Sequence, residues 1–138
     1  MNIAIVGATG NVGRKILEVL EKKNLSFDDL YLVASSKSAG SKIKFKDKEL
    51  EVYDLEKFDF SKAKITFFAA GGKISQNFAT KAAQNSIVID NSSFYRMDPD
   101  VPLIVPQVNA EDLKDIKKNI IANPNCSTSQ LLMALNPI

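Results

Sequence analysis

The chain opens with a strand, a glycine-rich turn and a helix in direct succession. Residues 3–6 are apolar and largely β-branched, which is typical of a strand buried on both faces of a parallel sheet. Glycines follow at positions 7, 10 and 13, and apolar residues at helical spacing predict a helix over residues 11–23. This order of elements predicts the first unit of an α/β fold.

The glycine turn has a known chemical use. Glycines let the backbone turn tightly and bring main-chain N–H groups close to a pyrophosphate at the start of the helix. The spacing here is Gly-x-x-Gly-x-x-Gly, which differs from the common Gly-x-Gly-x-x-Gly, and a tight turn without a ligand is the alternative. Because the turn follows the first strand of an alternating pattern, we predict a dinucleotide site at Gly7, Gly10 and Gly13.

Strands and helices alternate through the rest of the chain. Apolar runs predict strands at 30–34, 65–69, 87–89 and 120–122, and helices are predicted at about 75–85 and 110–117. Residues 42–53 alternate around a polar centre and predict a small exposed β-hairpin. The predicted fold class is therefore α/β, Rossmann-like, with a mostly parallel sheet and helices on both faces, and residues 1–138 are predicted to form a single domain.

The end of the strand at 30–34 bears on the choice between NAD and NADP. In NAD-binding versions of this fold, an acidic side chain roughly 20 residues beyond the glycine turn holds the ribose 2′-hydroxyl. Here Ser35, Lys37 and Ser38 follow the strand, and no Asp or Glu stands among them. A lysine attracts a 2′-phosphate, so we predict NADP; a polar loop with an incidental lysine is the alternative.

Two later strand ends are predicted to line the same crevice. Gly71 and Gly72 follow the strand at 65–69 and are expected to pass close to the cofactor, although a plain turn is the alternative. The strand at 87–89 delivers a polar loop that ends at Arg96, whose guanidinium can hold a phosphate or a carboxylate. A surface ion pair with Asp98 or Asp100 is an equally weighted alternative for Arg96.

The single cysteine, Cys126, follows the last predicted strand at the start of a short final helix. A helix N-terminus stabilises a thiolate through its dipole and its unpaired N–H groups. Pro124 prevents a preceding helix from continuing, and residues 130–135 have high helix propensity. We predict that Cys126 is a nucleophile; a small buried hydrophobic side chain is the alternative.

Composition argues against several other functions. The chain has 18 Lys+Arg against 16 Asp+Glu, and a net charge of +2 is too small to indicate nucleic-acid binding. No metal site is predicted, and one cysteine allows no intrachain disulfide. No apolar run is long enough to span a bilayer and no signal peptide is recognisable, so we expect no membrane association and a cytoplasmic location. The chain has no histidine and therefore cannot complete an acid–base step that needs imidazole.

Four segments together resemble the aspartate-semialdehyde dehydrogenases over essentially the whole chain. Residues 3–13 resemble the family's opening strand and cofactor loop, and residues 34–40 resemble its 2′-phosphate loop. Residues 90–106 resemble its phosphate and substrate segment, and residues 123–128, with the sequence Asn-Pro-Asn-Cys-Ser-Thr, resemble its nucleophile motif. The last two segments are specific to the family, whereas the first two occur in many nucleotide-binding proteins.

The resemblance implies an NADP-dependent, phosphorylating aldehyde oxidoreductase that interconverts L-aspartyl-4-phosphate and L-aspartate 4-semialdehyde in lysine, threonine and methionine biosynthesis. By position, Cys126 would form the thioester, Arg96 would bind the acyl-phosphate or inorganic phosphate, and Asn125 would shape the site. Thr9 to Val12, with Lys37 and Ser38, would hold the cofactor. The complete set of expected cofactor residues is Gly7, Thr9, Gly10, Asn11, Val12, Gly13, Ser35, Lys37, Ser38, Gly71 and Gly72.

The chain also departs from the family pattern. Lys37 replaces the more usual arginine, Phe94 stands where a smaller residue is common, and Gln107 where an acidic one is common. In the family, a second domain follows the cysteine helix and supplies a catalytic histidine and most of the contact of a homodimer or higher homo-oligomer. We therefore expect an N-terminal cofactor-binding part of a longer enzyme, with the catalytic and dimerisation domain absent and activity absent or nearly so.

Two alternatives to this function remain open. The first is a domain similar to N-acetyl-glutamyl-phosphate reductase, although that group usually has glycine directly before the cysteine. The second is a non-catalytic dinucleotide-binding regulator.

Overall fold

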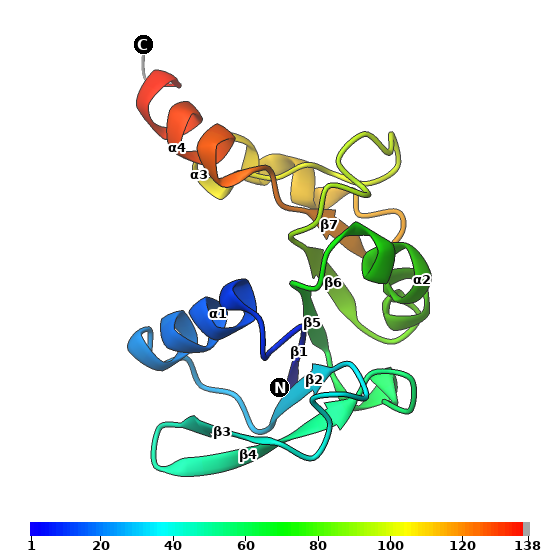
Figure 1. Cartoon of the computed structure of the whole chain (residues 1–138). Coiled ribbons are helices and arrows are strands. Elements are labelled where there is room, and N and C mark those ends of the chain that lie inside the picture. The colour runs from blue at the N-terminus through cyan, green and yellow to red at the C-terminus, as the bar shows by residue number, and fades with distance from the viewer. Residues whose placement is uncertain (137–138) are drawn as a thin grey trace.

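A seven-stranded sheet forms the centre of the computed structural model, which describes residues 1–136 (Figure 1). The strand order is β3-β4-β2-β1-β5-β6-β7, and every neighbouring pair is parallel except β3 and β4. The sheet confirms the predicted Rossmann-like α/β class. Its strands are β1 (Ile3–Val6), β2 (Leu30–Ala34), β3 (Lys42–Phe45), β4 (Lys48–Asp54), β5 (Ile65–Phe68), β6 (Ile87–Asp90) and β7 (Ile120–Ala122).

Strand β1 lies where the strand order reverses, with β2 on one side of it and β5 on the other. Ile3 pairs with Leu30 in β2 and with Ile65 in β5, so the three strands end at the same edge of the sheet. The loops that leave β1 and β5 run to opposite faces at this edge. In an open α/β sheet such a switch point is where a ligand crevice forms.

Helices cover both faces of the sheet, as predicted (Figure 1). Helix α1 (Asn11–Lys22) buries Leu17 and Leu20 in the same apolar cluster as Ile5 of β1. Helix α2 (Gly72–Ala83) packs on the other face, where Ala79 belongs to the cluster that contains Ala4. Neighbouring residues of β1 therefore supply the two cores, because successive side chains of a strand point to opposite faces.

The predicted hairpin at 42–53 is confirmed, but the prediction that it is small and exposed was wrong. Strands β3 and β4 form an antiparallel hairpin, and β4 also pairs in parallel with β2, so the hairpin is part of the main sheet and β3 is its edge strand. Ile43, Phe45 and Val52 are buried. The alternating sequence shows that one face is apolar, but it does not show that the face is covered by the rest of the protein.

Two helix predictions were wrong in extent. Helix α2 begins at Gly72 and not near Ser75, because Gly71 takes a left-handed φ of 87° and the backbone turns helical directly after it. In place of one helix at 110–117 the chain forms helix α3 (Pro106–Asn109) and a 3-10 turn over Ala110–Lys114. Asp115 ends this turn with non-helical backbone angles, φ −123° and ψ 70°.

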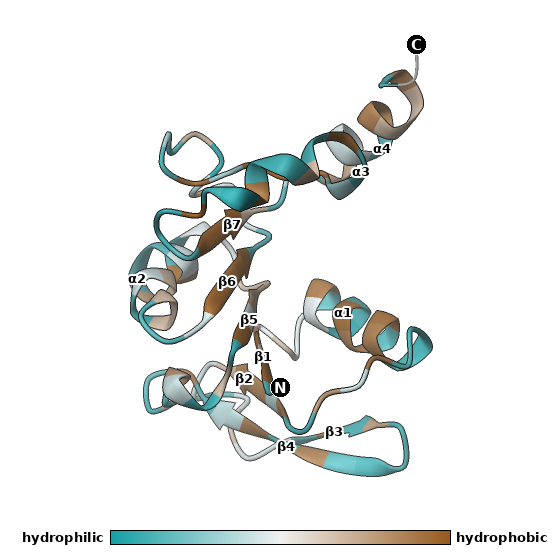
Figure 2. Ribbon diagram, turned by 180° about the vertical axis from the view of Figure 1, so that it is seen from behind, coloured by the Kyte–Doolittle hydropathy of each residue, from teal (hydrophilic) through white to brown (hydrophobic). Residues whose placement is uncertain are grey.

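Helix α4 (Cys126–Leu135) leaves the edge of the sheet and extends away from the body of the protein (Figures 1 and 2). Leu131, Met133 and Leu135 on this helix are 58%, 49% and 52% exposed. Across Cys126–Leu135 only Ser129 and Leu132 are even half-buried. The second half of the helix, residues 131–135, is therefore apolar and largely uncovered. Among the helices in residues 1–136, none has the length and hydropathy needed to cross a membrane.

Candidate active site

The three glycines of the first loop differ in what the surrounding backbone requires of them. A Cβ at Gly7 would lie 2.7 Å from the carbonyl oxygen of Ala69, and Gly7 has a left-handed φ of 87°. A Cβ at Gly13 would lie 2.2 Å from the carbonyl oxygen of Gly7. At Gly10 the corresponding distance to the Gly7 oxygen is 3.4 Å, an ordinary contact. Packing within the protein thus requires glycine at positions 7 and 13, whereas position 10 has space next to it.

The start of α1 is suited to an anion. Gly10 occupies the N-cap position without a side-chain hydrogen bond, and no acidic residue stands in the first turn of the helix. The N–H groups of a first helical turn have no intrahelical acceptor, and the helix dipole favours negative charge there. Arg14 steadies the loop, since its Nε donates to the carbonyl oxygen of Thr9 at 3.2 Å.

A cavity of about 810 Å³ extends from the start of α1 to the loops that follow β6 and β7. Asn11 and Val12 of α1 line it, together with Arg96, Asn125 and Cys126. Five of the residues predicted from the sequence as site residues therefore share one cavity. Its wall also includes one side of α1, where Val12 and Val19 are 44% and 45% exposed.

Cys126 is the first residue of α4 and is exposed. Asn125 is the N-cap: its Oδ1 accepts from the backbone N–H of Ser127 at 3.0 Å and from the Ser127 hydroxyl at 2.9 Å. The thiol Sγ donates to the same oxygen at 3.4 Å. The predicted position at a helix N-terminus is confirmed, and the alternative of a small buried side chain is wrong.

Arg96 is half-buried and reaches across the ends of two strands. Its Nε donates to the carbonyl oxygen of Asn123 at 3.0 Å, and its Nη2 donates to that of Asn91 at 3.1 Å. These are the hydrogen bonds of the guanidinium within residues 1–136, so its other N–H groups remain available to an anion in the cavity. The ion-pair alternative is wrong, because Asp98 and Asp100 pair with lysines instead.

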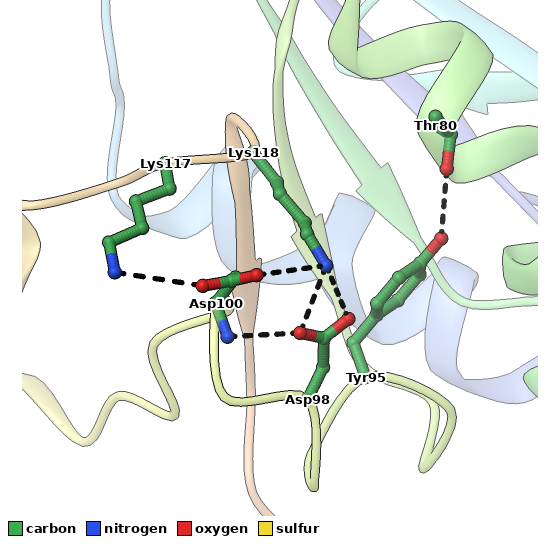
Figure 3. Close-up of polar contacts among 6 residues, drawn as sticks. All are labelled: Thr80, Tyr95, Asp98, Asp100, Lys117 and Lys118. Carbon is green, nitrogen blue, oxygen red and sulfur yellow. Dashed lines mark hydrogen bonds and ion pairs between the residues drawn. The ribbon is translucent and has the colours of Figure 1, made fainter.

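The segment that carries Arg96 is anchored on both sides (Figure 3). On one side, the hydroxyls of Tyr95 and Thr80 lie 3.1 Å apart, which ties the segment to α2. On the other side, Lys118 donates to both carboxylate oxygens of Asp98, at 3.0 Å and 2.8 Å, and lies 3.7 Å from Asp100. These contacts fix the backbone from which the guanidinium extends.

Replacing Lys118 by methionine should lower stability slightly near neutral pH, and the loss should disappear in acid. The hydrogen bond from Lys118, with one from the Asp100 backbone N–H, lowers the pKa of Asp98 below its ordinary 3.8. A carboxylate whose folded-state pKa is depressed contributes fully above about pH 4, and the contribution is lost as the pH falls through the folded-state pKa. The same bond raises the pKa of Lys118 above 10.5, so at the alkaline end its contribution is lost only as the pH rises beyond that value.

Urea unfolding of the two proteins at about pH 7 and about pH 2 measures this difference. Lys64→Met, at a lysine that forms no ion pair among residues 1–136, is the matched control and should show no such pH dependence. A stability difference for Lys118→Met that is equally large in acid would contradict the assignment.

The remaining predicted cofactor residues lie outside this cavity. Ser35 and Ser38 close a turn after β2, in which the Ser38 N–H donates to the Ser35 carbonyl at 2.9 Å, and Lys37 on the same turn is exposed. Gly71 and Gly72 begin α2, and a Cβ at Gly72 would lie 3.8 Å from the Cβ of Phe94. The start of α2 is thus next to the loop that leads to Arg96.

Sequence reasoning missed the residues that support the site from beneath. Asp90, at the end of β6, and Ser75, in α2, are fully buried and hydrogen-bonded to each other at 2.7 Å. Asn123 donates its amide to the side-chain oxygen of Asn91 at 2.6 Å, which joins the ends of β6 and β7. A carboxylate directly after an apolar run was the available signal for Asp90. Within residues 1–136, no group of three or more His, Cys, Asp or Glu side chains could hold a metal ion.

The fold and this cavity define a class of protein. A parallel sheet with a switch point at β1, a glycine turn before α1 and an exposed cysteine at the start of α4 together describe a dinucleotide-binding domain that carries a thiol in its ligand crevice.

Comparison with known proteins identifies the family. A family model described as the NAD-binding domain of semialdehyde dehydrogenase matches residues 2–116. Aspartate-semialdehyde dehydrogenase from Aquifex aeolicus is 55% identical over 99% of this chain, and from Shewanella violacea it is 49% identical over the same share. The chain belongs to the aspartate-semialdehyde dehydrogenase family and corresponds to its NAD(P)-binding domain. It covers 41% of the length of each of these relatives.

Solved structures agree with this assignment. The structure of aspartate-semialdehyde dehydrogenase II from Vibrio cholerae, complexed with ASA, superimposes with a TM-score of 0.96 at 48% identity, over 99% of this chain and 45% of that one. The enzyme from Candida albicans, solved with NADP, has a TM-score of 0.73 at 26% identity, over 99% of this chain and 46% of that one.

Proposed function

We propose that this chain is the NADP-binding, nucleophile-bearing domain of an enzyme that converts L-aspartyl-4-phosphate to L-aspartate 4-semialdehyde and phosphate through a cysteine thioester. The observation that carries the proposal is the single cavity that joins Cys126, Arg96 and the start of α1. Such a reaction needs a thiol, an anion site and a dinucleotide site within reach of one substrate. On the family resemblance, we place the reaction in lysine, threonine and methionine biosynthesis in the cytoplasm, in a homodimer or larger homo-oligomer.

The thiol would begin the reaction. The thiolate of Cys126 attacks the acyl carbon of the aspartyl phosphate, a carbon–sulfur bond forms, and the bond from that carbon to the phosphate oxygen breaks. The Oδ1 of Asn125 accepts the S–H of the protonated Cys126 thiol at 3.4 Å, and Asn125 caps the helix whose N-terminus stabilises the thiolate. Arg96 binds the leaving phosphate with the guanidinium N–H groups that are not engaged by Asn91 and Asn123.

The residues at the start of α1, two of which line the cavity, and the loops beside them fit a nicotinamide dinucleotide. Thr9 to Val12 present the open N-terminus of α1 to the pyrophosphate, and the space beside Gly10 allows the backbone to approach it. Lys37, with the hydroxyls of Ser35 and Ser38, would receive the 2′-phosphate, and Gly71 and Gly72 would lie along the cofactor. A bound nicotinamide would supply the hydride needed to reduce the thioester, with Cys126 released as the thiolate. The NADP in the Candida albicans relative supports this choice of cofactor.

Replacing Lys37 by alanine should weaken NADP binding about tenfold or more while leaving NAD binding unchanged, because only NADP carries the 2′-phosphate. Titration of the chain with each dinucleotide by calorimetry measures both affinities. Lys64→Ala, at an exposed lysine that directly precedes β5 at the opposite edge of the sheet, is the matched control and should change neither affinity. An equal loss for NAD and NADP in Lys37→Ala would contradict the role given to this lysine.

The proposed function is tested by the reactivity of the thiol together with turnover. Folded chain should react with iodoacetamide faster than the same chain unfolded in urea at the same pH, because only the folded helix stabilises the thiolate. The chain should not turn over aspartate semialdehyde, NADP and phosphate detectably, since without an imidazole it lacks a proton-transfer partner worth roughly 10²–10⁴ in rate. A thiol that reacts no faster when folded would favour the non-catalytic regulator, and turnover near that of a complete relative would contradict the expected inactivity.

A further inference from the structure

Asp90 is a fully buried carboxylate at the end of β6, with an exposed fraction of 0%. Its Oδ1 accepts from the hydroxyl of Ser75 at 2.7 Å and from the backbone N–H of Ser92 at 3.0 Å. Its Oδ2 accepts from the hydroxyl of Ser92 at 2.8 Å. Both carboxylate oxygens are therefore held, and the two serines belong to different elements.

One side of this arrangement leads to the start of α2. Ser75 lies in the first turn of the helix, and its N–H donates to the carbonyl oxygen of Gly71 at 3.2 Å. Asp90 thus holds the helix turn that follows Gly71 and Gly72, which the proposed function places along the cofactor.

The other side leads to the loop that carries Arg96. The hydroxyl of Ser92 accepts from the backbone N–H of Phe94 at 3.2 Å. The adjacent residue, Asn91, offers its carbonyl oxygen to the guanidinium of Arg96. Asp90 therefore also holds the loop from which the proposed phosphate ligand extends.

Packing alone does not call for a carboxylate at this position. No ion pair to Asp90 is present among residues 1–136, so its donors are neutral groups, and burying a charge without a countercharge is costly. The same sheet joins β5 to the residue before β6 with a neutral pair, Thr66 and Ser86, whose hydroxyls lie 2.8 Å apart. A carboxylate has two acceptor oxygens. It can therefore accept hydrogen bonds from α2 and from the loop after β6 at the same time and fix their relative positions.

We propose that Asp90 is a positioning residue that couples the cofactor loop at Gly71–Gly72 to the phosphate loop at Arg96. The inference rests on the proposed function, since it assumes that these two loops meet the cofactor and the phosphate. Ordering of one loop by its ligand is passed to the other through the shared carboxylate. Inorganic phosphate therefore increases the affinity of the chain for NADP, and NADP increases its affinity for phosphate by the same factor.

The test measures this coupling and not stability alone. NADP affinity of the chain is determined by titration with and without saturating inorganic phosphate, and phosphate binding is followed separately by protection of Cys126 from iodoacetamide. In the unsubstituted chain, phosphate should tighten NADP binding about fivefold or more. In Asp90→Asn, and in the milder Ser75→Ala and Ser92→Ala, the ratio should fall to about one. Thr66→Val, which removes a buried hydroxyl from the neutral pair, should lower stability and leave the ratio unchanged.

The outcomes separate the inference from the proposed function. If the unsubstituted chain neither binds NADP nor gains protection from phosphate, the proposed function fails and the coupling with it. If both ligands bind but the ratio is one, or if it survives in Ser75→Ala and Ser92→Ala, the role of Asp90 is overturned while the proposed function stands. The two serine variants keep the test decisive if Asp90→Asn does not fold.

Discussion

On the proposed function, replacing Cys126 by serine should lower the turnover of a full-length enzyme that carries this domain by on the order of 10⁴-fold or more, the scale on which an enzyme loses rate when its nucleophile is removed. A hydroxyl at this position has a far smaller ionised fraction than a thiol at neutral pH, so the helix N-terminus cannot make it an effective nucleophile. NADP affinity should not change, because Cys126 is in α4 and the proposed pyrophosphate site is at the start of α1. Steady-state turnover and NADP titration, carried out on the same preparation, check the two expectations.

Ser127→Ala is the matched control for Cys126→Ser. It lies in the same helical turn and removes the 2.9 Å hydrogen bond from the Ser127 hydroxyl to Asn125, while the thiol and its bond to Asn125 remain. Turnover should fall by no more than about tenfold, in line with the loss of one hydrogen bond. A Cys126→Ser enzyme that retains a turnover close to that of Ser127→Ala would exclude the thioester mechanism.

Replacing Gly13 by alanine should lower the free energy of unfolding by about 3 kcal/mol or more. The new Cβ would lie 2.2 Å from the carbonyl oxygen of Gly7 and 2.7 Å from the Cα of Ala8. Both are backbone atoms, so α1 as a whole must move away from β1 to admit the methyl group. Urea unfolding followed by circular dichroism measures the change in the free energy of unfolding.

Gly10→Ala is the control for Gly13→Ala and separates stability from binding. Its Cβ makes only an ordinary 3.4 Å contact with the Gly7 oxygen, so the free energy of unfolding should change by less than about 1 kcal/mol. NADP affinity should nevertheless fall about tenfold, because the methyl group would occupy the space in which the proposed pyrophosphate meets the backbone. Equal losses of stability in the two variants would show that the glycines serve only the packing of α1.

Much of the sheet was predictable from the sequence for a specific physical reason. Strand β1 is buried along its whole length, and β5 and β6 alternate half-buried with buried residues, so all three appear as short, mostly apolar runs. The edge formed by β3 and β4 was not predictable in the same way, since alternation within residues 42–53 identifies a hairpin but not its parallel pairing with β2. Strand pairing of this kind depends on residues far apart in the sequence.

In the candidate site, too, features that depend on neighbouring residues could be predicted from the sequence, and features that depend on distant residues could not. The position of Cys126 followed from Pro124 and from helix propensity, both of which act within a few residues. The guanidinium of Arg96 donates to the backbone carbonyl oxygens of Asn91 and Asn123. Because every residue has such an oxygen, the sequence does not indicate these two partners. Lys118 and Lys117, which pair with Asp98 and Asp100, lie about twenty positions further along the chain. From the local sequence, an ion pair between Arg96 and one of these carboxylates was therefore an equally weighted alternative.

Helix α4 has a consequence for when the thiol is reactive. The positive end of a helix exists only while its first turns are formed, and an isolated helix of this length is marginal in water. With Leu131, Met133 and Leu135 largely exposed, α4 gains little from burial, so its local opening should cost much less free energy than unfolding of the sheet. On the proposed role of Cys126, its reactivity should therefore follow the fraction of time in which the ten residues of α4 are helical, and a surface that covers Leu131 and Leu135 should raise that reactivity without touching the cysteine.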